Sequence, residues 1–348
     1  MKKDQRSMFV DLVRTAAALL IFIYHFNMEL TVKGAQASWI TTDAGKNIGL
    51  GQLGTALFIL LSGYTSCLSY RRISTGKRPW LTYYKKRLLS ILPMFYIAYL
   101  LAFTVLRLPD RSFDRTLVYT VFGMDGYLAM HGLKTCYLVG EWFTGCILLL
   151  YLLFPAIHAL SEKRPLILLT AALAIKAAAL IVIHKTGLTD NDLLFYLPDF
   201  IFGVLIFRAR SRIPQAAGWI CFALFLIFTA VSLPVSYRLL IMPCGVTLFL
   251  ALLCFSGLLE KRAGGRSGFI RIKKVLAAAA KYTYAIFLTH HVVISMVLRP
   301  VSGPIGRRAF AGTFLTALAF TVLTAVSVYG ANEYLKKLTG RGKNTENT

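Results

Sequence analysis

The sequence predicts an all-α fold: a polytopic transmembrane helical bundle of about ten helices with both termini in the cytoplasm. Its 348 residues are 57% hydrophobic and 16% charged, and the mean hydropathy is +0.63. A soluble domain of this size could not bury that much apolar surface, so lipid must form part of its solvent. The helices and their orientation follow from where the apolar stretches and the charges fall.

Ten apolar stretches approach the roughly 20 residues that a membrane span requires. They cover approximately 8–28, 48–70, 88–106, 139–160, 165–184, 193–208, 216–236, 239–259, 275–298 and 309–335. The connection of 107–138 is partly apolar but broken by Gly and Asp, so we expect a re-entrant or interfacial segment there. We predict one transmembrane domain over 1–338 and a disordered polar tail over 339–348.

The positions of the basic residues set the orientation. The net charge is +24, and 26 of the 39 Lys and Arg residues fall in the N-terminal segment, the C-terminal tail and the loops on the N-terminal side of the membrane. The opposite loops hold 11. Because positive charge is retained in the cytoplasm, both termini are predicted to lie inside. Membrane lipid therefore accounts for the basic charge, and we expect no nucleic-acid partner.

The six cysteines, at 67, 136, 146, 221, 244 and 254, form no C-x-x-C pair and do not alternate with histidine. Most lie within apolar stretches, which is typical of packing residues. We therefore expect neither a metal site nor a redox site.

The first span carries three ionisable residues, Asp11, Arg14 and His25. Charge inside a membrane is costly, so each is a functional candidate. Asp11 and Arg14 lie three residues apart and can pair near the cytoplasmic end. His25 follows Arg14 by eleven residues, which is about 16 Å along a helix and nearly the same face. Taken alone, His25 is more typical of a hydrogen-bonded interior residue.

Two further residues are expected at the outer level of His25. Glu141 opens the fourth span, and His290 lies about 22 Å up the ninth span from the cytoplasm. Together they could serve as base, orienting group and hydrogen-bond donor in acyl transfer. The alternative is that Glu141 and His290 face water at helix ends, and for His291, on another face, we favour that alternative.

Other charges have simpler interpretations. Lys176 and Asp199 both fall near mid-span, and we expect them to pair because an unpaired buried charge is expensive. The basic loop of 71–87 suits anionic lipid headgroups and also the phosphates of a nucleotide.

Five ordered motifs resemble those of the acyltransferase-3 family of membrane acyltransferases. "DLVRTAAALLIFIYH" fits the pattern D-x-x-R-x10-H with Asp11, Arg14 and His25 in place. It is followed by "GQLGTALFILLSGY", "YYKKRLLSILPMFY", "GEWFTGCILLLYLLFP" and "YTYAIFLTHHVVI", each similar to a family segment. The resemblance extends over nearly the whole chain.

The resemblance implies an acyltransferase of the O-acetyltransferase type, which transfers a group other than aminoacyl. The donor would be cytoplasmic acyl-CoA, often acetyl-CoA, and the acceptor an extracytoplasmic carbohydrate or lipid-linked glycan. His25 would be the base, because an imidazole can take the proton of a sugar hydroxyl as it attacks a thioester. The remaining assignments are Glu141 as a catalytic residue, Arg14, Arg72, Lys86 and Arg87 at the donor, and Trp142, Tyr284 and His290 at the acceptor.

The sequence also departs from the family pattern. The third motif has Lys86 where the family often has Arg, and Leu89 or Ser90 near a later Arg, which leaves phosphate contacts there open. We expect no fused hydrolase-like domain, and a multi-pass protein of the inner or plasma membrane of a bacterium. The alternative function is a flippase or transporter of a lipid-linked saccharide or other polar solute, although no internal repeats support it.

Overall fold

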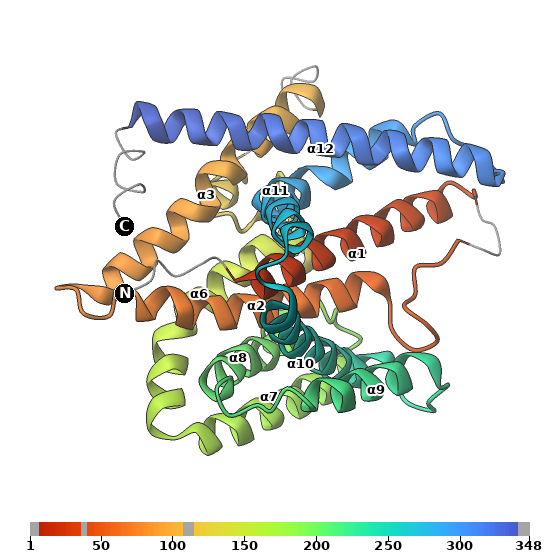
Figure 1. The fold of residues 1–348 in the computed structure, drawn as a ribbon. Helices are drawn as coiled ribbons and strands as arrows, with labels where there is room; N and C mark the ends of the chain where they lie inside the picture. The colour runs from red at the N-terminus through yellow and green to blue at the C-terminus, as the bar shows by residue number, and fades with distance from the viewer. Residues whose placement is uncertain (1–6, 36–39, 107–114, 340–348) are drawn as a thin grey trace. The chain divides into compact units, whose positions relative to one another are not determined.

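The computed structural model describes residues 7–35, 40–106 and 115–339, and every regular element in them is a helix (Figure 1). The only extended pairing in these ranges is an isolated bridge between Asp43 and Gly49. The helices are α1 (Met8–Val32), α2 (Leu50–Arg71), α3 (Pro79–Leu106), α4 (Leu117–Val121), α5 (Asp125–Met130), α6 (Glu141–Lys163), α7 (Pro165–Thr186), α8 (Leu193–Ala209), α9 (Ala217–Ala230), α10 (Tyr237–Ala263), α11 (Ser267–Val297) and α12 (Arg307–Leu338).

Each of the ten predicted spans overlaps one helix of the structure, which confirms the all-α fold. Seven of them are long and apolar enough to cross a membrane, namely α1, α2, α3, α6, α7, α10 and α12. Two others are shorter, with 17 residues in α8 and 14 in α9. The 31-residue α11 is long enough, but its first half is basic. That α8, α9 and α11 also cross stays a prediction.

The segment predicted to be re-entrant or interfacial contains two short helices, α4 and α5, of five and six residues. Neither is long enough to span a bilayer. Residues 107–114 of this segment lie outside the described residues, as do residues 340–348 of the predicted tail.

The chain forms two compact units, each built from three stretches of sequence. Unit 1 comprises Met1–Tyr24, Thr42–Tyr84 and Cys146–Lys281, and unit 2 comprises His25–Thr41, Lys85–Gly145 and Tyr282–Thr348. Helices α1, α3, α6 and α11 contribute one segment to each unit. The two units are described separately below.

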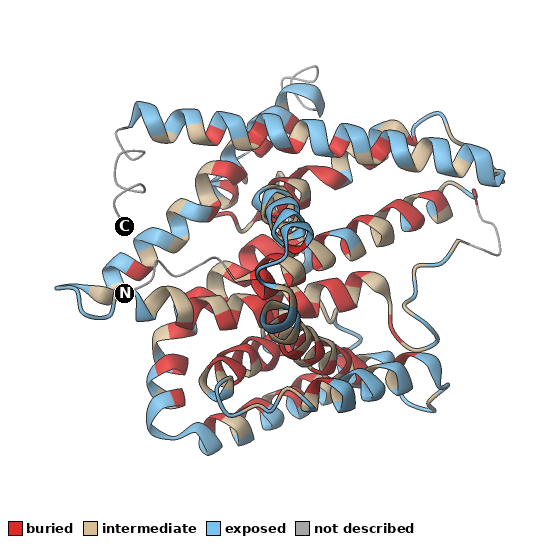
Figure 2. Cartoon of the chain, viewed as in Figure 1, coloured by how far each residue is buried: buried red, intermediate tan, exposed pale blue. Residues whose placement is uncertain are grey.

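Unit 1 is centred on the packing of α2 against α8, which is more extensive than any other helix pair in the described residues. The two backbones touch at Gly63 and Gly203. A Cβ on Gly63 would lie 2.1 Å from the carbonyl oxygen of Phe200, and one on Gly203 would lie 2.0 Å from that of Leu60. Small residues of this kind allow close helix approach in membranes, where packing rather than water exclusion holds helices together. Figure 2 shows both helices predominantly buried.

A buried ion pair joins α7 to α8 in unit 1, as predicted from the sequence. The Lys176 Nζ lies 3.4 Å from the Asp199 Oδ2, and both side chains are almost fully buried. The same ammonium donates to the carbonyl of Phe195 at 2.9 Å and lies 3.3 Å from the centre of the Phe195 ring. Lys176 is thus compensated by a carboxylate, a carbonyl and an aromatic face.

Unit 2 is held by aromatic contacts and by hydroxyl groups that bind loop carbonyls. The Phe26 ring on α1 packs edge-on against Phe310 and Phe314 of α12, with centroids 5.5 and 5.2 Å away. From α3, the Tyr99 hydroxyl donates to the carbonyl of Cys136 at 2.6 Å. This bond fixes the loop that leads into α6.

Large apolar side chains are exposed along α7 and α12 (Figure 2), including Leu166, Leu173, Leu315, Phe320 and Leu323. Continuous apolar exposure of this kind is tolerated where lipid, rather than water, covers the helix. None of the six cysteines is in a disulfide, and four are buried, which agrees with their interpretation as packing residues.

Candidate active site

Three histidines meet in unit 2. The His25 ring, on α1, lies edge-on to the rings of His290 and His291 on α11, with centroids 5.0 and 4.8 Å apart. The sequence predicted that His25 and His290 share one level, and the structure brings them into direct contact.

His290 has one ring nitrogen engaged and one available. Its Nδ1 lies 2.7 Å from the carbonyl oxygen of Phe287 and 3.2 Å from that of Ile286. Since carbonyls only accept, Nδ1 carries the proton, and Nε2 is left as an acceptor. That Nε2 is buried and has no hydrogen-bond partner among the described residues, in a residue that is 1% exposed. A buried acceptor of this kind can take a hydrogen bond from water or from a bound molecule.

Glu141, at the start of α6, faces the same group. Its Oε1 lies 3.6 Å from the Nε2 of His291, which makes an ion pair when His291 is protonated. The ligand atoms of His25, Glu141 and His291 all lie within 4.8 Å of one another. Two imidazoles and a carboxylate are donors that Zn²⁺ accepts, so these are the residues of this site that could hold a metal. The sequence analysis predicted that no metal binds here, and this stays a prediction.

The backbone at Glu141 is strained. Glu141 is the only non-glycine among the described residues with a positive φ, at 47°, and it follows Gly140 at 84°. On the other side, Gly126 of α5 packs so closely that a Cβ there would lie 2.3 Å from the carbonyl oxygen of Glu141. Such strain persists only where surrounding structure imposes it, and it clusters at functional sites.

Two residues of the segment before α6 complete the surroundings of Glu141. Burial raises the pKa of Tyr137, and the Glu141 carboxylate, to which its hydroxyl donates, raises that pKa further. Asp125 opens α5 and is 1% exposed. Burial raises the pKa of Asp125 to about 6, although hydrogen bonds from backbone groups and from Thr120 act in the opposite direction.

The predicted acceptor residues Trp142 and Tyr284 also lie in unit 2. Trp142 follows Glu141 on α6 and is 9% exposed. The Tyr284 hydroxyl donates to the carbonyl of Ile91 at 3.4 Å, and its ring is parallel to that of Phe287, which in turn neighbours His290. Tyr284 thus supports the helix face that carries His290.

The predicted donor residues are divided between the units. Arg14, half-buried on α1, and Arg72, exposed beyond α2, belong to unit 1. Lys86, exposed, and Arg87, half-buried, belong to the α3 segment of unit 2. A common donor site for these four residues stays a prediction, as does the pairing of Asp11 with Arg14.

Sequence reasoning missed three residues of the site. His291 was expected to face water, and its side chain is 48% exposed. Sequence reasoning missed that its ring also contacts His25 and that its Nε2 lies 3.6 Å from Glu141. Asp125 and Tyr137 were not singled out; the only sequence signal was an acidic residue and a tyrosine in the segment just before the motif that begins "GEW".

Comparison with known proteins agrees with the motifs. A family model described as an acyltransferase domain matches residues 8–331. The acyltransferase MdmB of Streptomyces mycarofaciens is 25% identical over 353 residues, which cover 91% of this chain and 87% of MdmB. No solved structure matches significantly. The chain therefore belongs to the acyltransferase-3 family of membrane acyltransferases.

Proposed function

We propose that this acyltransferase is an O-acyltransferase that moves an acyl group, in the first instance acetyl, from cytoplasmic acyl-CoA to a hydroxyl of an extracytoplasmic sugar or glycan. The observation that carries the proposal is the contact of His25 with His290 and His291 beside Glu141. A hydroxyl is a weak nucleophile at neutral pH, and this group offers a base together with residues that orient it.

In the proposed reaction His25 takes the proton of the acceptor hydroxyl. The hydroxyl oxygen then forms a bond to the thioester carbonyl carbon, and the carbon–sulfur bond breaks as the tetrahedral intermediate collapses. The CoA thiolate leaves with the bonding electrons and recovers a proton from the His25 imidazolium. The products are an ester and free CoA, so the reaction needs no further reactant.

The neighbouring residues have distinct proposed roles. Glu141 stabilises positive charge on His291, whose ring contacts His25. The buried Nε2 of His290 accepts a hydrogen bond from the acceptor, and Trp142, which follows Glu141 on α6, offers an aromatic surface for the sugar. Arg14 is proposed to bind the donor, as its family motif implies, and the basic residues Arg72, Lys86 and Arg87 are proposed to contribute to donor binding as well.

The test is the variant His25→Ala in purified protein, with CoA release and acylated glycan measured in parallel. Loss of a positioned base lowers transfer by about 100-fold to 10,000-fold, whereas acyl-CoA affinity should stay unchanged. Replacing the exposed His184 on α7 by Ala is the matched control and should leave transfer intact. A folded His25→Ala protein with normal transfer contradicts the proposal.

A second pair of variants separates donor binding from chemistry. Arg14→Ala should weaken acyl-CoA binding, and Arg14→Lys should restore it only in part because a point charge cannot reproduce the planar fork of guanidinium. If Arg14→Ala binds acyl-CoA as tightly as the unaltered protein, Arg14 is not a donor-binding residue.

A further inference from the structure

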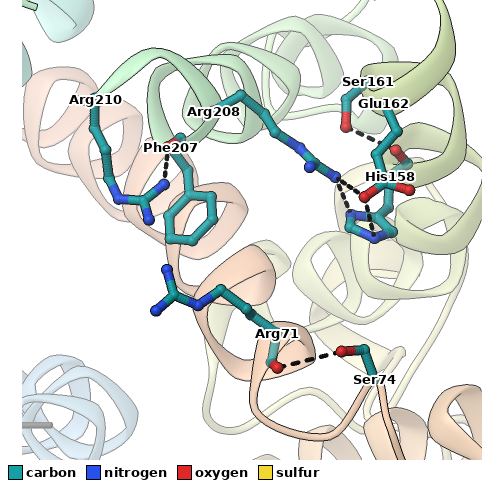
Figure 3. Close-up of polar contacts among 8 residues, drawn as sticks. All are labelled: Arg71, Ser74, His158, Ser161, Glu162, Phe207, Arg208 and Arg210. Carbon is teal, nitrogen blue, oxygen red and sulfur yellow. Dashed lines mark hydrogen bonds and ion pairs between the residues drawn. The ribbon is translucent and has the colours of Figure 1, made fainter. Parts of the chain in front are cut away.

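Two arginines stand at the C-terminal ends of helices in unit 1: Arg71 is the last residue of α2 and Arg210 follows α8 directly. The helices touch at Gly63 and Gly203, and further along the same seam the Tyr64 ring packs edge-on against Phe207, with centroids 5.2 Å apart. Arg71 follows Tyr64 by two helical turns and so lies on the same face of α2. Figure 3 shows the guanidinium groups of Arg71 and Arg210 directed toward the same space beside the Phe207 ring.

Arg210 is held in place without a carboxylate. Its guanidinium stacks on the Phe207 ring, 3.8 Å from the centroid, and donates to the carbonyl of Phe207. Among the described residues neither Arg71 nor Arg210 forms an ion pair. Two like charges directed at one space repel each other, unless an anion lies between them.

The neighbouring Arg208 shows the opposite arrangement. It makes an ion pair with Glu162 at 2.9 Å and lies 3.0 Å from the Nδ1 of His158. The fold therefore supplies a carboxylate for Arg208, which braces α6 against α8, and none among the described residues for Arg71 and Arg210 (Figure 3). The uncompensated pair has the chemistry of a phosphate site, because guanidinium groups bind phosphate oxygens through paired N–H donors.

We propose that Arg71 and Arg210 form a clamp for the phosphate groups of the nucleotide portion of the acyl donor. This inference rests on the proposed function, since it needs a donor that carries phosphate. Arg71 opens the basic loop of 71–87 that suits nucleotide phosphates, whereas Arg210 belongs to another segment and was not among the predicted donor residues. The Phe207 ring and carbonyl preorganise Arg210, so little side-chain freedom is lost when the phosphate binds.

The test measures CoA binding to the purified full-length protein by calorimetry, with folding monitored by the melting temperature. Arg71→Gln and Arg210→Gln should each weaken binding about 10- to 100-fold, the worth of a hydrogen bond to a charged group. Arg212→Gln is the matched control. It removes the same charge two residues along, but Arg212 lines a separate groove of about 770 Å³ with Leu166 and Leu250, and CoA affinity should hold.

A second measurement separates lost phosphate contacts from damage to the fold. An acetyl thioester of pantetheine carries no phosphate, so Arg71→Gln and Arg210→Gln should use it as well as the unaltered protein does. Equal CoA affinity in the unaltered protein and both variants overturns the clamp and leaves the proposed function standing. An unaltered protein that binds no acyl-CoA refutes the proposed function itself.

An anionic phospholipid headgroup is the other source of phosphate at a membrane surface. Retention of phosphatidylglycerol through purification distinguishes the two sources. If both variants lose that lipid but keep their CoA affinity, the clamp belongs to lipid and the inference is overturned. If CoA affinity falls while lipid retention is unchanged, the donor assignment is supported.

Discussion

Lys176→Met tests how much the buried ion pair of unit 1 contributes to stability. The Lys176 and Asp199 side chains are 6% and 0% exposed, and their charged atoms are 3.4 Å apart. Removing one member of such a pair typically costs about 3–5 kcal/mol, because the other charge stays buried and uncompensated. We expect the destabilisation by Lys176→Met to fall in this range. Among the described residues Asp199 has no other cation near it, and its Oδ1 is already without a hydrogen bond.

Asp199→Asn should be milder. Lys176 would keep its hydrogen bond to the carbonyl of Phe195 and its position over the Phe195 ring, which together offset part of the lost attraction. We expect Asp199→Asn to lower the free energy of unfolding by about 1–3 kcal/mol, because Lys176 keeps one charge-assisted hydrogen bond.

The double variant Lys176→Met/Asp199→Asn decides whether the pair acts as a unit. The double variant should lose less unfolding free energy than the two single variants together, by at least about 1 kcal/mol, as expected for residues in contact. The free energy of unfolding can be followed by SDS titration in mixed micelles. Lys185→Met, at an exposed position on α7, is the control and should change stability by less than about 0.5 kcal/mol. Additive losses would refute the coupling.

The remaining predictions concern α5 and the start of α6. Because the folded pKa of Asp125 is raised to about 6, the stability this residue contributes is present in acid and lost as pH rises through that value. In the unaltered protein the free energy of unfolding should fall by about 3 kcal/mol as the pH rises from roughly 4 to 6. Asp125→Asn should remove this fall, so its melting temperature should change less with pH over that range. Gly126→Ala should destabilise the protein by about 1–3 kcal/mol through overpacking and lower transfer, whereas Gly312→Ala, where a Cβ meets open space, should do neither; an unchanged melting temperature for Gly126→Ala would contradict the close packing. Glu141→Gly should be about 1 kcal/mol more stable than Glu141→Ala, since only glycine accepts the positive φ without strain, and both should lose transfer activity; equal stabilities would show that the backbone is relaxed.

Helix positions were predictable because a long apolar stretch has few alternatives in a membrane, where every backbone polar group must be bonded within the chain. The pairing of Lys176 with Asp199 was predictable for the same reason: two opposite charges at one depth have few other partners. The end of α9 was less predictable, because the predicted stretch of 216–236 runs past Ala230, where the helix ends before Ser232 and Pro234. The start of α8 was predictable, and there the Asp192 side chain caps the helix by accepting from the Leu194 amide.

The site was only partly predictable. Sequence spacing predicted a common depth for His25, Glu141 and His290, but depth does not specify which side chains touch. Neighbouring residues on a helix point about 100° apart, which suggested that His291 must face away from His290. In the structure the His25 ring contacts both, because a ring on one helix can reach two adjacent positions on the helix opposite.

The conformation of Glu141 is a tertiary effect that no local pattern signals. A glutamate favours the helical or extended regions, and a positive φ at this residue costs on the order of 1–3 kcal/mol. Here the chain turns sharply through Gly140 into α6 while Gly126 packs against the Glu141 carbonyl. The turn directs the carboxylate toward His291, whose ring contacts His25. If the carboxylate had no role there, glycine would suit the turn better, so the presence of a strained glutamate at this position is an argument for its part in the chemistry.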